Sequence, residues 1–515
     1  MIGATAVLAL ATVTLALSAL AGVLYSRGRV ESVESFVTTR DSVGSGMLTA
    51  TLIASAMGVW ILFSPAQAGA EFGGLSAAIG YAVGSALPLL AYVKLGPRIR
   101  RLIPEGHSLT EYALARYGRA MYGFVLLVSV FYMFVFLAAE LVAITGAFAL
   151  VGGVPRWQTA VLVGGFVLVY TGYGGFSASV FTDTLQTLLI LPLLAGTAVV
   201  TVLALGGPAA VQHHLAATDP SLLDPGFWPG VEFGVYTSIG VLGAEMLNQT
   251  WWQRIFAAEN DRTLRRSFLV AAVANFALVL LAGLLGVIAA GEVTLGQGGY
   301  VYANAYFALV FETLPSGAAL VVALLALLLV VSTVDTLYNA IASIVTADLP
   351  RFEATPAGTP LKTVARAFTA VVAAGAVWVS LQTTSVLDLF FLADVLAAAV
   401  MVPLLLGLYS RSHGQVSALT GGVAGLAVGL AYFPLPLVRG PLAAVPVLGG
   451  WLPEAGFLYA FVGAAGLSTA VSIVGAWLGP ESFEFSRLEL EIRSLDEVVT
   501  DGGQTADGDR EVRDR

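Results

Sequence analysis

The sequence predicts an all-α polytopic membrane protein with about thirteen transmembrane helices. Of its 515 residues, 57% are hydrophobic and only 11% are charged, and the mean hydropathy is +0.86. Apolar runs long enough to cross about 30 Å of hydrocarbon recur from one end of the chain to the other. This composition excludes a globular protein in water.

The thirteen expected helices follow one another with mostly short connections. The first is too long for the apolar core of a signal peptide and lacks a basic leader, so we expect it to be retained. To within several residues, the helices are expected at 2–25, 45–71, 74–97, 119–150, 156–173, 176–205, 230–249, 267–290, 316–348, 363–383, 387–410, 414–434 and 455–479.

The distribution of basic residues predicts how the chain crosses the membrane. Lys and Arg collect in short cytoplasmic loops. With the N terminus outside, seventeen basic residues before the C-terminal tail fall on the cytoplasmic side, and only Arg156 and Arg439 fall on the other. We therefore expect a multi-pass protein of the plasma membrane with its C terminus in the cytoplasm.

The stretch from Thr51 to Gly74 cannot be an ordinary spanning helix. Small residues and poor helix formers occupy it, and Pro65 removes a backbone donor. Backbone freed at membrane depth is tolerated only where protein or a cavity covers it. Transporters place ion and substrate sites at such interruptions, so the stretch predicts a transporter.

The helix count also predicts two repeats of opposite orientation. After an extra N-terminal helix at 1–25, five helices lie within 45–205 and five more within 230–410. An odd number of crossings inserts the second group upside down, which is a known plan for transporters. Two further helices follow at 414–479, and the acidic segment 480–515 is expected to be a disordered cytoplasmic tail.

Four stretches of the chain resemble the sodium:solute symporter family. They are YTGYGGFSASVFTDTLQ from Tyr170, NQTWWQRIFAA at 248–258, STVDTLYNAIASIVTADL at 332–349 and PLLLGLYSRSHG at 403–414. The resemblance covers about residues 30–430. It implies an inverted-repeat fold in which co-transported sodium drives uptake of a small solute by alternating access.

The residues from Leu329 to Thr333 are candidates for a sodium site. Ser332 and Thr333 follow Leu329 by about one turn, so one carbonyl and two hydroxyls can face the same point, and sodium prefers oxygen ligands. The resemblance implies that the carbonyls of Ala54 and Met57 complete this site. The alternative is that both hydroxyls only bond back to the preceding helical turn.

Asp183, Asp335 and Thr336 are candidates for a second cation or proton site. In some members of the family an aspartate and several hydroxyls at these positions bind a second sodium, and here Asp335 replaces the usual serine. Two neighbouring carboxylates can hold a cation or share a proton. The alternative for Asp183 is a partner for a helix dipole.

The candidate solute-binding residues are Trp60, Ile61, Glu140 and Glu245. Sugar-transporting relatives carry polar groups where this chain has Trp60 and Ile61, so a sugar is disfavoured. The two glutamates suit an ammonium or guanidinium group of the solute, a coupling proton, or a neutral structural role. A nitrogenous solute such as an amino acid, amine or urea is slightly favoured. Asp394 is a further candidate for a cavity-facing position.

Other features narrow the function. The chain has no cysteine, which excludes disulfides and thiolate chemistry. It shows no phosphate loop, catalytic triad or nucleic-acid patch, so we expect neither an enzyme nor a nucleic-acid partner. Trp251 to Arg254 are expected to form an aromatic belt with an interfacial arginine. Two alternatives stay open: a proton-coupled transporter, with Asp335 or Glu245 carrying the proton, and a membrane sensor module.

Overall fold

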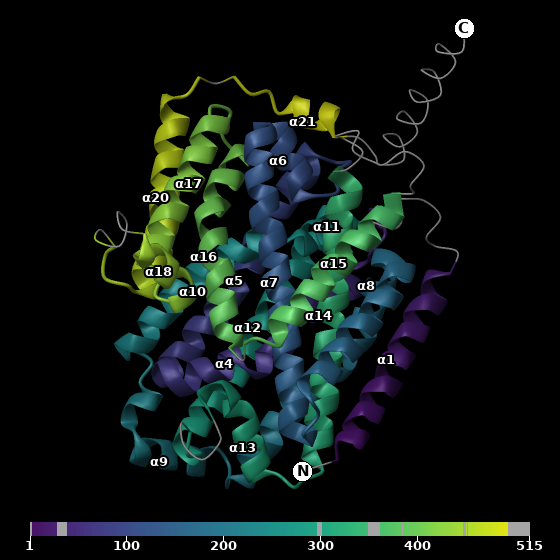
Figure 1. Ribbon diagram of the computed structural model, residues 1–515, viewed down its shortest axis with the longest axis vertical. Helices are drawn as coiled ribbons and strands as arrows, with labels where there is room; N and C mark the ends of the chain where they lie inside the picture. The colour runs from purple at the N-terminus through teal and green to yellow at the C-terminus, as the bar shows by residue number, and fades with distance from the viewer. Residues whose placement is uncertain are drawn as a thin grey trace.

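The protein is an all-helical bundle. The computed structural model describes residues 3–27, 39–295, 301–348, 361–383, 385–445, 450, 452–480 and 482–492. Within these ranges the sole strand-like pairing is one isolated bridge between Val43 and Ala258. Most of the long helices run in roughly the same direction, up or down the molecule (Figure 1). The predicted fold class is therefore confirmed.

Each predicted range contains a long helix or part of one. By length and composition, ten helices among the described residues can cross a membrane. The long helices are α1 (Ala4–Ser26), α3 (Ser45–Ala56), α5 (Gly74–Leu102), α7 (Arg119–Gly152), α8 (Arg156–Ala204), α10 (Trp228–Met246), α12 (Asp261–Glu292), α14 (Ala318–Asp348), α15 (Leu361–Ser380), α16 (Val386–Leu405), α17 (Gln415–Tyr432) and α20 (Phe457–Leu478).

Shorter helices cover the two ends of the bundle. Helices α6 (Leu109–Tyr117) and α21 (Ser486–Glu491) lie at one end, and α9 (Pro208–Thr218) and α13 (Ala305–Thr313) lie at the opposite end (Figure 1). Helix α18 (Pro436–Ala444) precedes α20. Another short helix, α11 (Gln249–Ala257), lies inside the bundle, and all nine of its residues are buried.

The first helix of each predicted repeat is broken. Helix α3 ends at Ala56, and Met57 and Gly58 are extended before the 3₁₀ turn η1 (Val59–Leu62) begins. The chain continues through α4 (Ser64–Gln67) and the π-helical turn η2 (Ala68–Gly73). In the second repeat, the break at Leu247 and Asn248 separates α10 from α11. The interruption predicted between Thr51 and Gly74 is present.

Helix α8 contains the boundary between two predicted spans. Gly175 has φ 62° and ψ −163°, which no helical residue adopts. The two halves of α8 therefore correspond to the separate helices expected at 156–173 and 176–205. The second half packs against α1, where the rings of Tyr25 and Phe181 stack with centroids 4.1 Å apart.

Helices α5 and α10 cross with almost no side chain between them. A Cβ atom added to Gly80 would lie 2.4 Å from the Cα of Gly234, and one added to Gly234 would lie 2.6 Å from the Cα of Gly80. Only glycine permits so close an approach of two backbones. On the other flank, α17 and α20 pack against α16.

Candidate transport site

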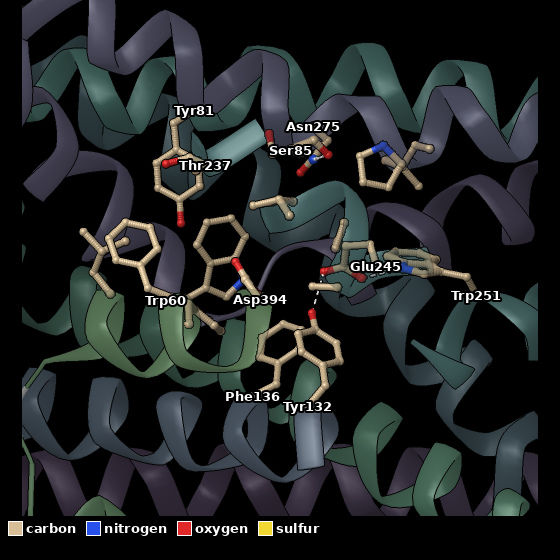
Figure 2. Close-up of a pocket in the computed structure, with 18 residues that line it drawn as sticks. Trp60, Tyr81, Ser85, Tyr132, Phe136, Thr237, Glu245, Trp251, Asn275 and Asp394 are labelled. Carbon is tan, nitrogen blue, oxygen red and sulfur yellow. Dashed lines mark hydrogen bonds between the residues drawn. The ribbon is translucent and has the colours of Figure 1, made fainter. Parts of the chain in front are cut away.

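A cavity at the centre of the bundle is lined by aromatic rings and two carboxylates. Its walls come from α3, η1, α5, α7, α10, α11, α12 and α16 (Figure 2). The carboxylates are Glu245 and Asp394. The rings belong to Trp60, Tyr81, Tyr132, Phe136, Trp251, Phe390 and Phe391.

Trp60 connects the break in the first repeat to this cavity. Its ring centroid lies 5.9 Å from that of Tyr81 and 5.9 Å from that of Phe390. Phe390 also packs edge-on against Phe136, at 5.3 Å. Of the two predicted wall residues, Trp60 does line the cavity, whereas Ile61 is buried and not among its lining residues. Because a 3₁₀ turn has three residues per turn, consecutive side chains of η1 point in different directions, and Ile61 does not share the direction of Trp60.

The Glu245 carboxylate is held in place by three donors. The Tyr132 hydroxyl donates at 3.0 Å, the Asn248 amide at 2.9 Å and the Trp251 indole N–H at 2.5 Å. Figure 2 shows Tyr132 approaching from below in that view and Trp251 beside the carboxylate. Because Asn248 lies at the break after α10, the acid is positioned by the unwound segment. The structure thus brings this predicted solute-binding residue to the cavity.

Asp394 faces the same cavity, and no side chain or backbone group in the described part of the chain donates to its carboxylate. It lies in the third turn of α16, and 4% of it is exposed. Among the described residues, no hydrogen bond or ion pair satisfies its carboxylate. A buried carboxylate without a partner is costly, and a cation entering the cavity would remove this cost. Its signal in the sequence is an acidic residue well inside an apolar helix.

Glu140 is not part of the cavity wall. The residue is fully buried, and its carboxylate accepts the backbone N–H groups of Val59 at 2.8 Å and Trp60 at 3.3 Å. It therefore satisfies donors that the helix break leaves free. Direct contact with the solute was expected for Glu140, but the structure places its carboxylate against the backbone at the break instead of at the cavity wall.

The predicted sodium site lies where the end of α3 meets α14. All five of its residues are buried, with at most 1% exposed: Ala54, Met57, Leu329, Ser332 and Thr333. Helix α3 stops at this point, so carbonyls near its end lack the usual partners four residues on. These oxygens and the hydroxyls of α14 have the chemistry that sodium needs.

The two hydroxyls of the predicted sodium site already make hydrogen bonds. Thr333 donates to the Leu329 carbonyl at 3.2 Å, which is the back-bonding named as the alternative. Ser332 donates to Asp183 at 2.6 Å instead. Each hydroxyl oxygen keeps lone pairs that can accept a cation while its proton stays in these bonds. The assignment of sodium to these residues stays a prediction.

Arg254 fills the centre of the second predicted site. Its guanidinium is fully buried and lies 3.1 Å from a carboxylate oxygen of Asp183. It also donates to the hydroxyls of Thr51 at 2.9 Å and Thr336 at 3.2 Å, and to Ser55. We call these five residues the arginine cluster. It joins α3, α8, α11 and α14 through one cation.

Asp335 borders the arginine cluster. Its carboxylate accepts from the Ser179 hydroxyl at 2.7 Å and from Thr182 at 3.3 Å. Ser179 also lies 3.4 Å from the hydroxyl of Thr336. The three residues of the predicted second site, Asp183, Asp335 and Thr336, are therefore brought together.

The expectation for the segment from Trp251 to Arg254 was wrong. In place of an interfacial belt, Trp251 and Trp252 are 1% and 0% exposed, and Arg254 is 0% exposed. A hydropathy pattern cannot show that a nine-residue helix folds back into the bundle. The available signal was Asp183, because a carboxylate at membrane depth calls for a cationic partner.

Comparison with known proteins identifies the family. The model of the sodium:solute symporter family matches residues 36–425. The chain is 26% identical over 420 residues to the spermidine transporter DUR31 of Candida albicans, covering 80% of this chain and 78% of that one. It is 26% identical to a probable urea active transporter of Schizosaccharomyces pombe, covering 51% of this chain but 41% of the relative. A sodium/pantothenate symporter of Haemophilus influenzae is 30% identical over 43% of this chain and 49% of its own length.

Solved structures share the fold. A Na⁺-coupled sialic acid symporter, in a substrate-bound outward-open state, matches with a TM-score of 0.72 and 18% identity, over 92% of this chain and 98% of that one. Mhp1, a nucleobase-cation-symport-1 family transporter in a closed conformation, matches with a TM-score of 0.55 and 16% identity. The match covers 88% of this chain and 98% of Mhp1. The inverted-repeat architecture is thus confirmed. The chain belongs to the sodium:solute symporter family, and it is a sodium-coupled carrier of a small solute rather than an enzyme.

Proposed function

We propose that the protein imports an organic amine cation together with sodium. The observation that carries this proposal is the Asp394 carboxylate, which faces the central cavity with no donor from the described residues. An ammonium group supplies both the opposite charge and the hydrogen-bond donors that this acid lacks. Glu245 adds a second negative charge to the same cavity, fixed by its three donors.

The aromatic lining supports a cation over a neutral solute. Rings attract an ammonium group placed over their faces, and the attraction grows when water is excluded. They also cover the methylene segments of an aliphatic amine. The spermidine transporter of Candida albicans and the probable urea active transporter of Schizosaccharomyces pombe, which are similar to this chain, agree with a nitrogenous solute.

Coupling follows if sodium binds one conformation better than the other. We place sodium at Ala54, Met57, Leu329, Ser332 and Thr333, where it would hold α3 against α14. Because Trp60 follows the same break, sodium binding favours the state in which the cavity is ready for the solute. For Asp183, Asp335 and Thr336 we propose a cation site whose cation in this state is the Arg254 guanidinium.

The proposed direction of transport follows the basic residues. We place the protein in the plasma membrane with its N terminus outside, so that the end bearing α6 and α21 faces the cytoplasm. The low sodium concentration there would release both ion and solute after the helices rock around the cavity.

Uptake under separately imposed gradients tests this function. In proteoliposomes, labelled putrescine or spermidine is expected to accumulate when an inward sodium gradient is applied, and glucose and galactose are not. Accumulation driven by a proton gradient alone would favour the proton-coupled alternative. Absence of flux under both gradients would favour the sensor alternative.

Thr333→Ala is expected to weaken the sodium dependence of uptake. Loss of one hydroxyl ligand should raise the sodium concentration for half-maximal uptake by about tenfold, which corresponds to ~1.4 kcal/mol of binding free energy. Uptake is measured against external sodium at fixed amine concentration. Thr346→Ala is the matched control, because Thr346 lies on the same helix and its hydroxyl donates back to the carbonyls of Ala342 and Ser343 in the preceding turn. Equal sodium curves for both variants would contradict the site.

A further inference from the structure

Glu140 stands one helical turn beyond the solute cavity. Tyr132, Phe136 and Glu140 are spaced by four residues on α7, so their side chains follow one face of that helix. The first two line the cavity, and Glu140 continues the row toward the break between α3 and η1. The carboxylate is thus buried between the solute cavity and the broken backbone.

The Glu140 carboxylate occupies two of the backbone donors at the break. Its two oxygens accept from Val59 and Trp60, one each. Gly58 makes this approach possible, because a Cβ atom there would lie 2.1 Å from one carboxylate oxygen and 2.5 Å from the other. Glu140 can therefore reach the backbone at the break because residue 58 has no side chain.

This arrangement makes the N–H groups of Val59 and Trp60 unavailable to an acidic group of the solute. In transporters with broken helices, freed backbone donors bind the carboxylate of an anionic or zwitterionic solute. Here Val59 and Trp60 already donate to the protein's own acid. A solute carboxylate that came near would also meet like charge in a medium of low dielectric constant.

We propose that Glu140 determines specificity by excluding amines that also carry a carboxylate. Diamines and polyamines then enter the cavity, and amino acids of the same length do not. This inference rests on the proposed function, since it requires that the central cavity receives an amine. It narrows the solute from nitrogenous compounds in general to amines without an acidic group.

Putrescine and ornithine provide the test, because they differ by a single carboxylate. In proteoliposomes with the wild-type protein, unlabelled ornithine should inhibit sodium-driven uptake of labelled putrescine at least about 100-fold more weakly than unlabelled putrescine does, because like charges oppose each other at a dry site. Glu140→Gln removes the charge and keeps the size. It should reduce this difference to about tenfold or less. Glu140→Asp keeps the charge and should retain most of the difference.

The outcomes separate this inference from the proposed function. Wild-type protein that takes up no amine at all would overturn both. Wild-type protein that accepts ornithine as well as putrescine would overturn the role of Glu140 and leave amine transport standing. If ornithine inhibits putrescine uptake as weakly in Glu140→Gln as in the wild type, the role of Glu140 is overturned in the same way. Folding of Glu140→Gln is judged by the thermal shift that sodium induces. If this variant does not fold, Gly58→Ala is the second test, since its methyl group displaces the carboxylate from both N–H groups. Gly58→Ala should then reduce the difference between ornithine and putrescine, and an unchanged difference would overturn the role of Glu140.

Discussion

Asp394→Asn is expected to lower kcat/KM for amine uptake by about 10- to 100-fold, because hydrogen bonds to charged groups contribute ~1.5–3 kcal/mol. The substitution keeps the shape of the side chain and removes its negative charge. The solute ammonium then loses an acid in the cavity that receives no hydrogen bond from the residues the structure describes. Uptake of labelled putrescine in proteoliposomes under a sodium gradient measures the effect.

Two comparisons make the Asp394 result specific. Asp388→Asn is the matched control, because Asp388 lies on the same helix, is exposed and does not line the cavity. It should leave uptake within about twofold of the wild type, as surface changes usually do. The thermal shift that sodium induces should survive in Asp394→Asn, since the predicted sodium site lies elsewhere. Normal amine uptake by Asp394→Asn would refute the placement of the ammonium group.

Arg254→Ala is expected to destabilise the fold by about 3–5 kcal/mol, because removal of one partner leaves a buried charge uncompensated. Asp183 would keep hydrogen bonds from Thr51 and Ser332 but lose its cation. The variant should unfold at a markedly lower temperature in detergent. The contacts among α3, α8 and α14 should also loosen, because Arg254 holds these three helices together.

A double-mutant cycle tests whether Arg254 acts through Asp183. Asp183→Asn combined with Arg254→Ala should recover part of the lost stability, since the uncompensated charge is gone. Arg487→Ala is the control, because Arg487 forms an exposed pair with Glu491 and such pairs contribute about 0–1 kcal/mol. Additive effects of the two changes at Asp183 and Arg254 would show that the ion pair does not account for the stability.

The fold follows largely from hydropathy because each crossing needs its own apolar run. The break after Ala56 was visible as small residues and Pro65 inside such a run, and the boundary at Gly175 separated two predicted spans. What hydropathy could not show is the path of polar segments. The buried helix α11 carries Trp, Gln and Arg, and only tertiary packing reveals that these side chains point into the bundle.

The sequence predicted many of the individual site residues but not which residues they contact. Glu245 and Trp60 reached the cavity, and Asp183, Asp335 and Thr336 came together as expected. The roles of Glu140 and Arg254 were missed for the same physical reason. Each is a charge satisfied by a segment distant in sequence, Glu140 by the backbone at the break and Arg254 by Asp183. A single sequence gives the cost of burying such a charge but does not name its partner.

The glycine contact between α5 and α10 has a mechanical consequence for alternating access. Side chains that interlock at a helix crossing must change rotamer or slide past one another when the crossing angle changes. At Gly80 and Gly234 no side chain stands between the two backbones. The glycine contact can therefore act as a pivot. The two helices can change their crossing angle there, with tight contact preserved while their ends move apart.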